Sequence, residues 1–177
     1  MARIIKRVKE LKVFSNRLGR LYDDHVRGPQ GDTGNYLRWQ WKQKAVSIIP
    51  RRSGYIGLAK MFRYPISAFS WEFPRGGISR SESIQSASRR ELLEETGLVG
   101  SKLRLLGSIF PDTGLIQNEL QVVLAEIQSA GTSKQEKFES IGEIVWLTEK
   151  EFEKRIRSQK ITCAITIASY SLYKLNT

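Results

Sequence analysis

The sequence has little of several residue types on which common kinds of site depend. Its 177 residues include one cysteine and one histidine, which rules out a disulfide framework and a histidine-built zinc site. Cys163 lies in the apolar run ITCAITIA and is interpreted as a small core residue. His25 is interpreted as structural. No serine stands in a nucleophile-elbow pattern, so a serine–histidine triad is disfavoured.

Long apolar runs are also missing. No run approaches the roughly 18 residues that a membrane-spanning helix needs. The N-terminal stretch MARIIKRVKELKVF lacks the apolar segment and cleavage site of a signal peptide. Together with the single cysteine, which fits a reducing compartment, these absences favour a cytoplasmic protein with no membrane partner.

Negative charge is scarce. The chain has 29 Lys and Arg against 18 Asp and Glu, a formal net charge of +11. Such a chain can attract polyanions, either nucleic acid or a small phosphorylated compound. Zinc-finger spacing, an RNA-recognition signature and a long basic helix are all absent, which disfavours nucleic acid as a partner. The basic N-terminus fits a solvated arm and a functional arm equally well.

The hydrophobic pattern predicts an α/β fold in which a mixed sheet carries helices on both faces. Residues 36–50 read as one strand, and further strands are expected at YIGLAKMFR, WEFP, LRLLGSIF, LQVVLAEI and EIVWLT. RGGISRSES is expected to be irregular. Ser83 can cap a helix over residues 84–96 that ends at Gly97. Two more helices are expected near EKEFEKRIRS and CAITIASYSLYKL.

Against this basic background, the stretch RRELLEETG concentrates acidic residues within one helical turn, where like charges destabilise a helix. On a helical wheel, Glu91 and Glu95 fall beside Ile84, flanked by Ala87 and Leu92. Two carboxylates thus share the arc that carries apolar residues, and their burial needs compensation. A Mg²⁺ ion, which prefers hard oxygen ligands, would supply it. The wheel therefore favours a metal site over a salt-bridged surface.

The residues before this helix extend the acidic motif. The spacing resembles the Nudix box at each of its nine defined positions, which are Gly76, Glu82, Arg90, Glu91, Leu92, Glu94, Glu95, Gly97 and Leu98. The resemblance implies a Nudix-type α/β/α sandwich and hydrolysis of nucleoside diphosphates linked to another group. Mg²⁺ is the expected cofactor, with Mn²⁺ as the alternative.

The same resemblance implies roles for individual residues. The implied metal ligands are the backbone carbonyl of Arg75 and the carboxylates of Glu82, Glu91 and Glu95. Glu82 either joins the metal cluster or braces the helix. Glu94 assists the ligands in catalysis, and Arg90 orients a carboxylate through a salt bridge.

Similarity to the ADP-ribose and nucleoside-diphosphate-sugar pyrophosphatase branch covers nearly the whole chain. It is carried by SNRLGRLYDDHVRGPQG, KMFRYPISAFSWEFPRGG, FPDTGLIQNE and EIVWLTEKEFEKRI. It implies substrate contacts by Arg63, Trp39 and Glu119, where Trp39 would help to sandwich the base; the alternative for Trp39 is a core or interface position. The branch usually has a small residue where Arg75 stands, often a glutamine where Met61 stands, and often a proline–glycine pair where this chain has PDTG. These departures leave the sugar open.

The resemblance also places the general base on the loop of residues 129–140, where Glu139 is preferred over Glu136 because it lies closer to the following strand. Glu119 or a box carboxylate is the alternative base. A long polar loop inside a compact domain is more often functional than idle.

The expected organisation is an N-terminal β-rich dimerisation arm, residues 1–43, followed by a Nudix hydrolase domain, residues 44–177. The expected function is Mg²⁺-dependent hydrolysis of ADP-ribose or a related nucleoside diphosphate sugar to a nucleoside monophosphate and a sugar phosphate, by a homodimer. One alternative is a Nudix pyrophosphohydrolase acting on RNA 5′ ends or other nucleotides. Another is a non-catalytic nucleotide sensor, although such sensors usually lack box glutamates that this chain retains.

Overall fold

The computed structural model describes residues 4–130 and 141–177. The chain divides into two compact units. The first comprises residues up to Lys44 together with Phe110–Glu119, and the second comprises Ala45–Ile109 and Leu120–Thr177. The first unit thus adds a central segment to the region expected to form the N-terminal arm.

The first unit is a small antiparallel sheet built around one long strand. Strand β3 (Gly19–Arg27) pairs with β1 (Lys6–Lys9), β2 (Lys12–Ser15) and β4 (Thr33–Trp41). Arg38 ties the unit together. Its guanidinium donates to Asp24 at 2.6 Å, Glu10 at 2.7 Å and Gln117 at 2.5 Å, and stacks on the Tyr22 ring at 3.8 Å.

The prediction of a single strand over residues 36–50 is wrong. The chain bends at residues 42–43, so β4 ends at Trp41 and β5 (Lys44–Arg52) begins after the bend. At the bend, the Lys42 N–H donates to the Leu18 carbonyl at 2.9 Å. This long-range hydrogen bond has no local signature in the run of aromatic and β-branched residues.

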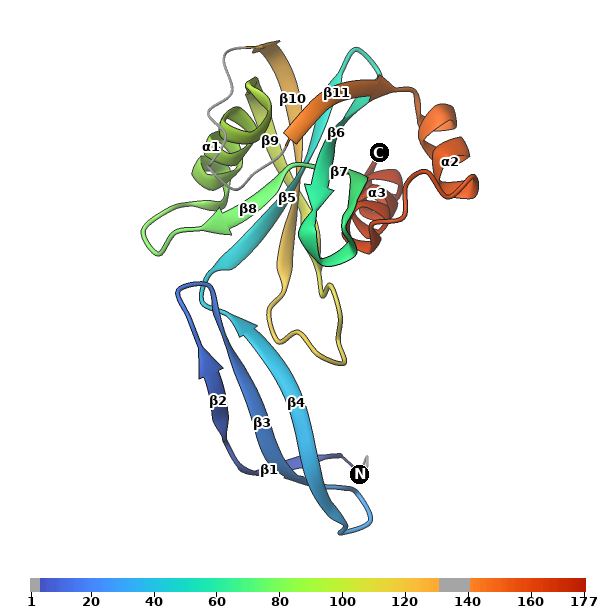
Figure 1. Cartoon of the computed structure of the whole chain (residues 1–177). Coiled ribbons are helices and arrows are strands. Elements are labelled where there is room, and N and C mark those ends of the chain that lie inside the picture. Colours follow the sequence, from blue (N-terminus) through green and yellow to red (C-terminus); the bar gives the residue numbers. More distant parts are fainter. Residues whose placement is uncertain (1–3, 131–140) are drawn as a thin grey trace. The chain divides into compact units, whose positions relative to one another are not determined.

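The second unit contains a seven-stranded mixed sheet (Figure 1). Its main path runs β11-β6-β5-β10-β9, while β7 pairs with β6 and β8 pairs with β5. Strands β5 and β10 are parallel, whereas β10 is antiparallel to β9. After β5 the bounds are β6 (Tyr55–Arg63), the 3-10 turn η1 (Tyr64–Ile66), β7 (Ala68–Glu72), β8 (Arg75–Ile78), β9 (Leu98–Ile109), β10 (Leu120–Ala130) and β11 (Ile141–Leu147).

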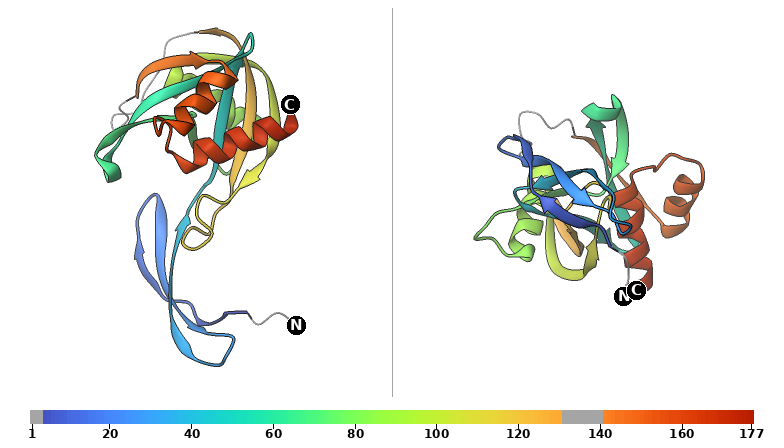
Figure 2. Two further views of the ribbon diagram at one scale, coloured as in Figure 1. Left: turned by 90° about the vertical axis from the view of Figure 1, so that its right-hand side faces the viewer. Right: turned by 90° about the horizontal axis from the view of Figure 1, so that it is seen from below.

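Three helices cover the two faces of this sheet. Helix α1 (Ile84–Thr96) lies on one face, and α2 (Glu149–Arg157) and α3 (Ala164–Asn176) lie on the other (Figures 1 and 2). Alternation along β10 builds both cores, because neighbouring strand residues point to opposite faces. Val122 packs in the core that contains Phe152 of α2, while Val123 packs in the core that contains Leu92 of α1. The expected α/β class with a mixed sheet is confirmed. No helix in the described part of the chain is long and apolar enough to cross a membrane.

Strand β8 corrects the expectation that RGGISRSES is irregular throughout. Arg75–Ile78 pairs with β5, and Ile78 is buried in the core beneath α1. Its glycines weaken the strand signal in the sequence. The strand matters for function because it places Arg75 and Gly76 beside the acidic helix.

Candidate functional site

The acidic helix α1 begins and ends through local interactions. The Ser83 side chain accepts a hydrogen bond from the Ser86 N–H at 3.1 Å, as an N-cap residue does. Gly97 ends the helix in the left-handed conformation with φ of 70°, which glycine adopts without steric cost, and its N–H donates to the Leu93 carbonyl. Both ends fall where the sequence predicted them.

Arg90 lies at the centre of the carboxylates on this helix. Its guanidinium donates through two nitrogens to Glu82, at 3.1 and 2.9 Å, and through Nη1 to Glu91 at 2.8 Å and Glu94 at 2.9 Å. It also donates to the Gly77 carbonyl at 2.9 Å. The hydrogen bond to Glu82, more than any other contact, raises the pKa of Arg90 above its usual value. One guanidinium therefore offsets part of the repulsion among three carboxylates and fixes their positions.

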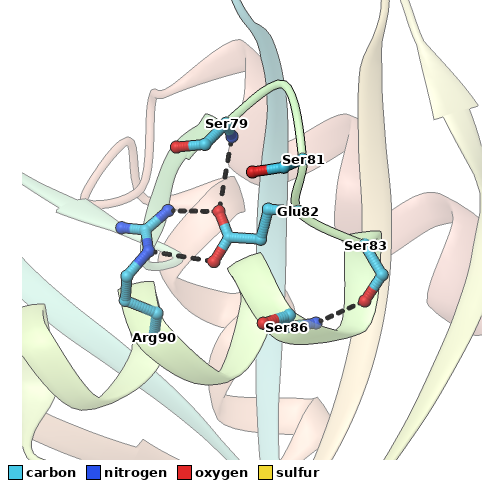
Figure 3. Close-up of a pocket in the computed structure, with 6 residues that line it drawn as sticks. All are labelled: Ser79, Ser81, Glu82, Ser83, Ser86 and Arg90. Carbon is cyan, nitrogen blue, oxygen red and sulfur yellow. Dashed lines mark hydrogen bonds and ion pairs between the residues drawn. The ribbon is translucent and has the colours of Figure 1, made fainter.

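Glu82 anchors the loop that leads into α1 (Figure 3). Besides Arg90, its carboxylate accepts from the Ser79 N–H at 3.3 Å. The Arg90 hydrogen bond, followed by the Ser79 contact among the favourable influences, lowers the pKa of Glu82. An open cavity of about 550 Å³ borders this loop, lined by Ser79, Ser81, Glu82, Ser83, Ser86 and Arg90. Through these contacts Glu82 links the loop to Arg90 of α1.

Glu91 and Glu95 pack against the backbone of strand β8. The Glu95 carboxylate is almost fully buried and accepts from the Arg75 N–H at 3.0 Å. Gly76 touches Glu91 so closely that a Cβ there would lie 2.0 Å from the Glu91 carboxyl carbon. Glycine at this position therefore leaves room for a carboxylate. Burial of Glu95 alongside Ala87 and Leu92 agrees with the helical wheel.

The donor chemistry around Glu91 and Glu95 fits a hard divalent cation. Among the described residues, no three acidic, histidine or cysteine side chains form a ready-made metal cage. Mg²⁺ does not require one, because it usually keeps several waters and binds one or two carboxylates together with substrate phosphates. Glu91 and Glu95 would be the protein's share of such a site, with the Arg75 carbonyl as a further oxygen.

Glu72 is a charged residue of this region that the sequence reasoning did not single out. Its carboxylate is 4% exposed and pairs with Arg63 at 2.7 Å and with Arg75 at 3.0 Å. Burial alone would raise the pKa of Glu72, but the Arg63 hydrogen bond and the Arg75 charge outweigh burial and lower it. The signal was present in the sequence, since Glu72 is the one charged residue of the strand AFSWE.

The remaining predicted site residues lie elsewhere. Trp39 and Glu119 belong to the first unit. The Trp39 ring meets Trp41 edge-on at 5.2 Å, and its indole N–H is buried without a hydrogen-bond acceptor among the described residues. Glu119 is half-buried. Glu139 and Glu136 lie outside the described residues. The second unit thus brings together the box residues, Arg63 and Arg75.

Comparisons with known proteins agree with this geometry. Residues 41–164 match the family described as the NUDIX domain. An ADP-ribose pyrophosphatase of Bacillus subtilis is 26% identical over 162 residues, which cover 91% of this chain and 88% of that protein. An uncharacterized Nudix hydrolase of Schizosaccharomyces pombe is 35% identical over 91 residues, 51% of this chain and 44% of that protein.

Two further similarities differ in extent. An RNA pyrophosphohydrolase of Actinobacillus pleuropneumoniae is 42% identical over 59 residues, 33% of this chain and 27% of that protein. A crystal structure of an ADP compounds hydrolase aligns with a TM-score of 0.84 at 18% identity, covering 96% of this chain and 92% of that chain. The first likeness is confined to a short segment, and the second shows a shared fold over nearly the whole chain.

Proposed function

The chain belongs to the Nudix family of hydrolases acting on phosphoric anhydrides, and we propose that it is a Mg²⁺-dependent pyrophosphatase of ADP-ribose or a related nucleoside diphosphate sugar. The products would be a nucleoside monophosphate and a sugar phosphate. The observation that carries the proposal is the pair Glu91 and Glu95, both packed against the Arg75–Gly76 backbone. A diphosphate held there would lie next to the hard oxygen donors.

In this proposal, each residue of the site has a limited task. A bound Mg²⁺ would neutralise the diphosphate charge and acidify water. Glu91 and Glu95 bind the ion, with Mn²⁺ as an alternative occupant. Arg90 holds the Glu91 and Glu94 carboxylates in place through its recorded hydrogen bonds. Because these carboxylates are already engaged, a separate base must take the proton of the attacking water, and we assign that role to Glu139.

The substrate contacts are assigned to Arg63, Trp39 and Glu119. The extent of similarity favours the sugar branch over RNA 5′ ends. The ADP-ribose pyrophosphatase relative aligns over 91% of this chain, whereas the RNA pyrophosphohydrolase relative aligns over 33%. A non-catalytic sensor is disfavoured because all four box glutamates are present.

A substrate panel tests the proposal. Purified protein with Mg²⁺ is incubated with ADP-ribose, other nucleoside diphosphate sugars and a 5′-triphosphorylated RNA, and a phosphatase releases phosphate from the products. Rapid turnover of a nucleotide sugar and slow turnover of RNA are expected. Preference for RNA would mean that RNA 5′ ends, and not nucleoside diphosphate sugars, are the substrate class. Tight nucleotide binding without turnover would favour the sensor.

We also propose that the protein is a cytoplasmic homodimer formed through the first unit. That sheet leaves large apolar side chains exposed, including Val13, Phe14, Leu37 and Trp41. A thin sheet with many exposed large apolar side chains is typical of surfaces covered by a partner. Light scattering at micromolar concentration should give twice the monomer mass of 20.3 kDa. A monomer mass would contradict the dimer and leave the hydrolase proposal intact.

A further inference from the structure

A second cluster of charged side chains lies beside the box glutamates. Around Arg90, one guanidinium pairs with several carboxylates, whereas here one buried carboxylate, Glu72, lies between two guanidiniums. Arg63 donates through Nε to Glu72 Oε1 at 3.1 Å and through Nη2 to Oε2 at 2.7 Å. Arg75 Nη2 lies 3.0 Å from the same Oε2. Bidentate pairing fixes the orientation of Arg63. The cluster is therefore a rigid arrangement in which positive charge exceeds negative charge.

The excess charge is accessible. The side chains of Arg63 and Arg75 are 31% and 24% exposed, whereas Glu72 is 4% exposed. Within the described part of the chain, neither Nη1 of Arg63 nor Nε of Arg75 has a recorded acceptor. The other Arg75 nitrogen, Nη1, has only Cys163 Sγ at 4.0 Å. The planar guanidinium fork matches the oxygens of carboxylates and phosphates, so these two donors suit a phosphate or a carboxylate.

Arg75 connects this cluster to the proposed diphosphate site. Its side chain pairs with Glu72, while its backbone N–H donates to Glu95 at 3.0 Å. The next residue, Gly76, lies against Glu91. An anionic group on the two guanidiniums would thus be adjacent to a diphosphate bound at the glutamates.

A competing explanation is that the guanidiniums only balance the acidic helix. Glu95 does contribute to the raised pKa of Arg63, although the Glu72 hydrogen bond contributes more. However, Glu91 and Glu94 already pair with Arg90. A bound divalent cation would supply further positive charge to the glutamates. Balance alone does not explain the second guanidinium at Glu72.

We propose that Arg75, together with Arg63, determines specificity by selecting nucleoside diphosphate sugars whose sugar moiety carries a further anionic group, either a phosphate or a carboxylate. This inference rests on the proposed function and narrows its substrate class. The sequence departs from the sugar branch at this position, since an arginine replaces the usual small residue. The side chain of Arg75, rather than its backbone, would make the selection.

Two matched substrate pairs test the selection. UDP-glucuronate differs from UDP-glucose by one carboxylate, and ADP-ribose phosphorylated on its terminal ribose differs from ADP-ribose by one phosphate. The kcat/KM ratio of charged to neutral member is measured for wild type, Arg75→Ala and Arg75→Lys. Arg157→Ala is the control, because Arg157 is 73% exposed and lies on α2. Using the ratio cancels any loss that affects both members equally.

In wild type and in Arg157→Ala, we expect the charged member of at least one pair to be preferred by about tenfold or more, as for a charge-assisted hydrogen bond. Comparison of the carboxylate pair with the phosphate pair identifies which anionic group Arg75 recognises. Arg75→Ala should bring the ratio close to one, and Arg75→Lys should restore part of it. A wild-type ratio near one in both pairs, or a ratio unchanged in Arg75→Ala, would overturn the inference.

Binding without turnover separates this inference from the proposed function. Calorimetry with wild type in EDTA should show tighter binding of the charged member, and Arg75→Ala should remove the difference. Equal affinities of wild type for both members of each pair would contradict selection of the anionic group by Arg75. Absence of hydrolysis of every member with Mg²⁺ would instead count against the proposed function.

Discussion

Two charge clusters meet at strand β8 and differ in sign. Around Arg90, one guanidinium is shared by Glu82, Glu91 and Glu94. Around Glu72, one carboxylate is shared by two guanidiniums. The same ion-pair chemistry therefore leaves negative charge at one cluster and positive charge at the other. Because partly buried ion pairs add little net stability, this asymmetry is better explained by ligands, a cation at the first cluster and an anion at the second.

Removing a carboxylate from the acidic cluster should have the largest effect. Glu95→Gln keeps the shape of the side chain and removes one of the two charges that we propose hold the metal. Turnover should fall by about 10³-fold or more, which corresponds to several kcal/mol of activation free energy. Glu153→Gln, on the opposite helix layer, is the matched control. A Glu95→Gln variant that retains half the wild-type rate at saturating Mg²⁺ would refute the assignment.

The general base is expected to lie outside both clusters. Glu139→Gln should lower kcat by about 10² to 10⁴ with nearly unchanged KM, since it removes proton transfer but no metal ligand. Glu136→Gln and Glu119→Gln are the comparisons. If Glu139→Gln leaves kcat unchanged and Glu136→Gln or Glu119→Gln lowers it strongly, the general base is not Glu139, while the metal assignment stands.

Breaking the basic cluster should affect stability. Glu72→Gln leaves two guanidiniums without their buried counter-charge, so the free energy of unfolding should fall by about 3 kcal/mol in urea titrations. The control Glu153→Gln should lose less than about 1 kcal/mol, because its ion pairs with Arg157 and Lys174 are exposed and the glutamine oxygen can still accept the Tyr170 hydrogen bond.

The pH dependence sharpens this prediction. The folded pKa of Glu72 lies below its ordinary value of 4.5, chiefly because the Arg63 hydrogen bond outweighs burial. Its contribution to stability is therefore present above pH 4.5 and is lost as the pH falls through the lower folded pKa. In Glu72→Gln, this part of the decrease in the free energy of unfolding at low pH should be absent. Parallel stability curves for wild type and variant would contradict the pairing.

Gly76→Ala should have a smaller effect, confined to the acidic cluster. The new Cβ would displace the Glu91 carboxyl group, which is the end of a flexible side chain, so the fold should survive. The Mg²⁺ concentration for half-maximal activity should rise by about tenfold. Gly97→Ala is the contrast, because its φ of 70° strains alanine and should cost about 1 kcal/mol of stability. An unchanged Mg²⁺ requirement in Gly76→Ala would show that Glu91 does not hold the ion.

The sequence predicted those parts of the molecule that local signals determine. Ser83 and Gly97 marked both ends of α1, and the spacing of the glutamates identified the acidic cluster before any fold was known. The bend at residues 42–43 and strand β8 depend on pairing between distant segments, which local composition does not encode. Glu72 stood out locally as the one charged residue of AFSWE, but its ion pair with Arg63 was not predictable, since the two residues meet only when β6 and β7 pair.

The most direct test of the central claim is a Mg²⁺ titration of ADP-ribose hydrolysis with both products quantified. Wild type depleted of metal with EDTA should be inactive. Added Mg²⁺ should restore activity, releasing AMP and ribose 5-phosphate in equal amounts. Hydrolysis that continues in EDTA would contradict a metal-dependent diphosphate site at Glu91 and Glu95, and so would recovery of ADP-ribose and every other nucleotide sugar of the panel intact at high enzyme and Mg²⁺ concentrations.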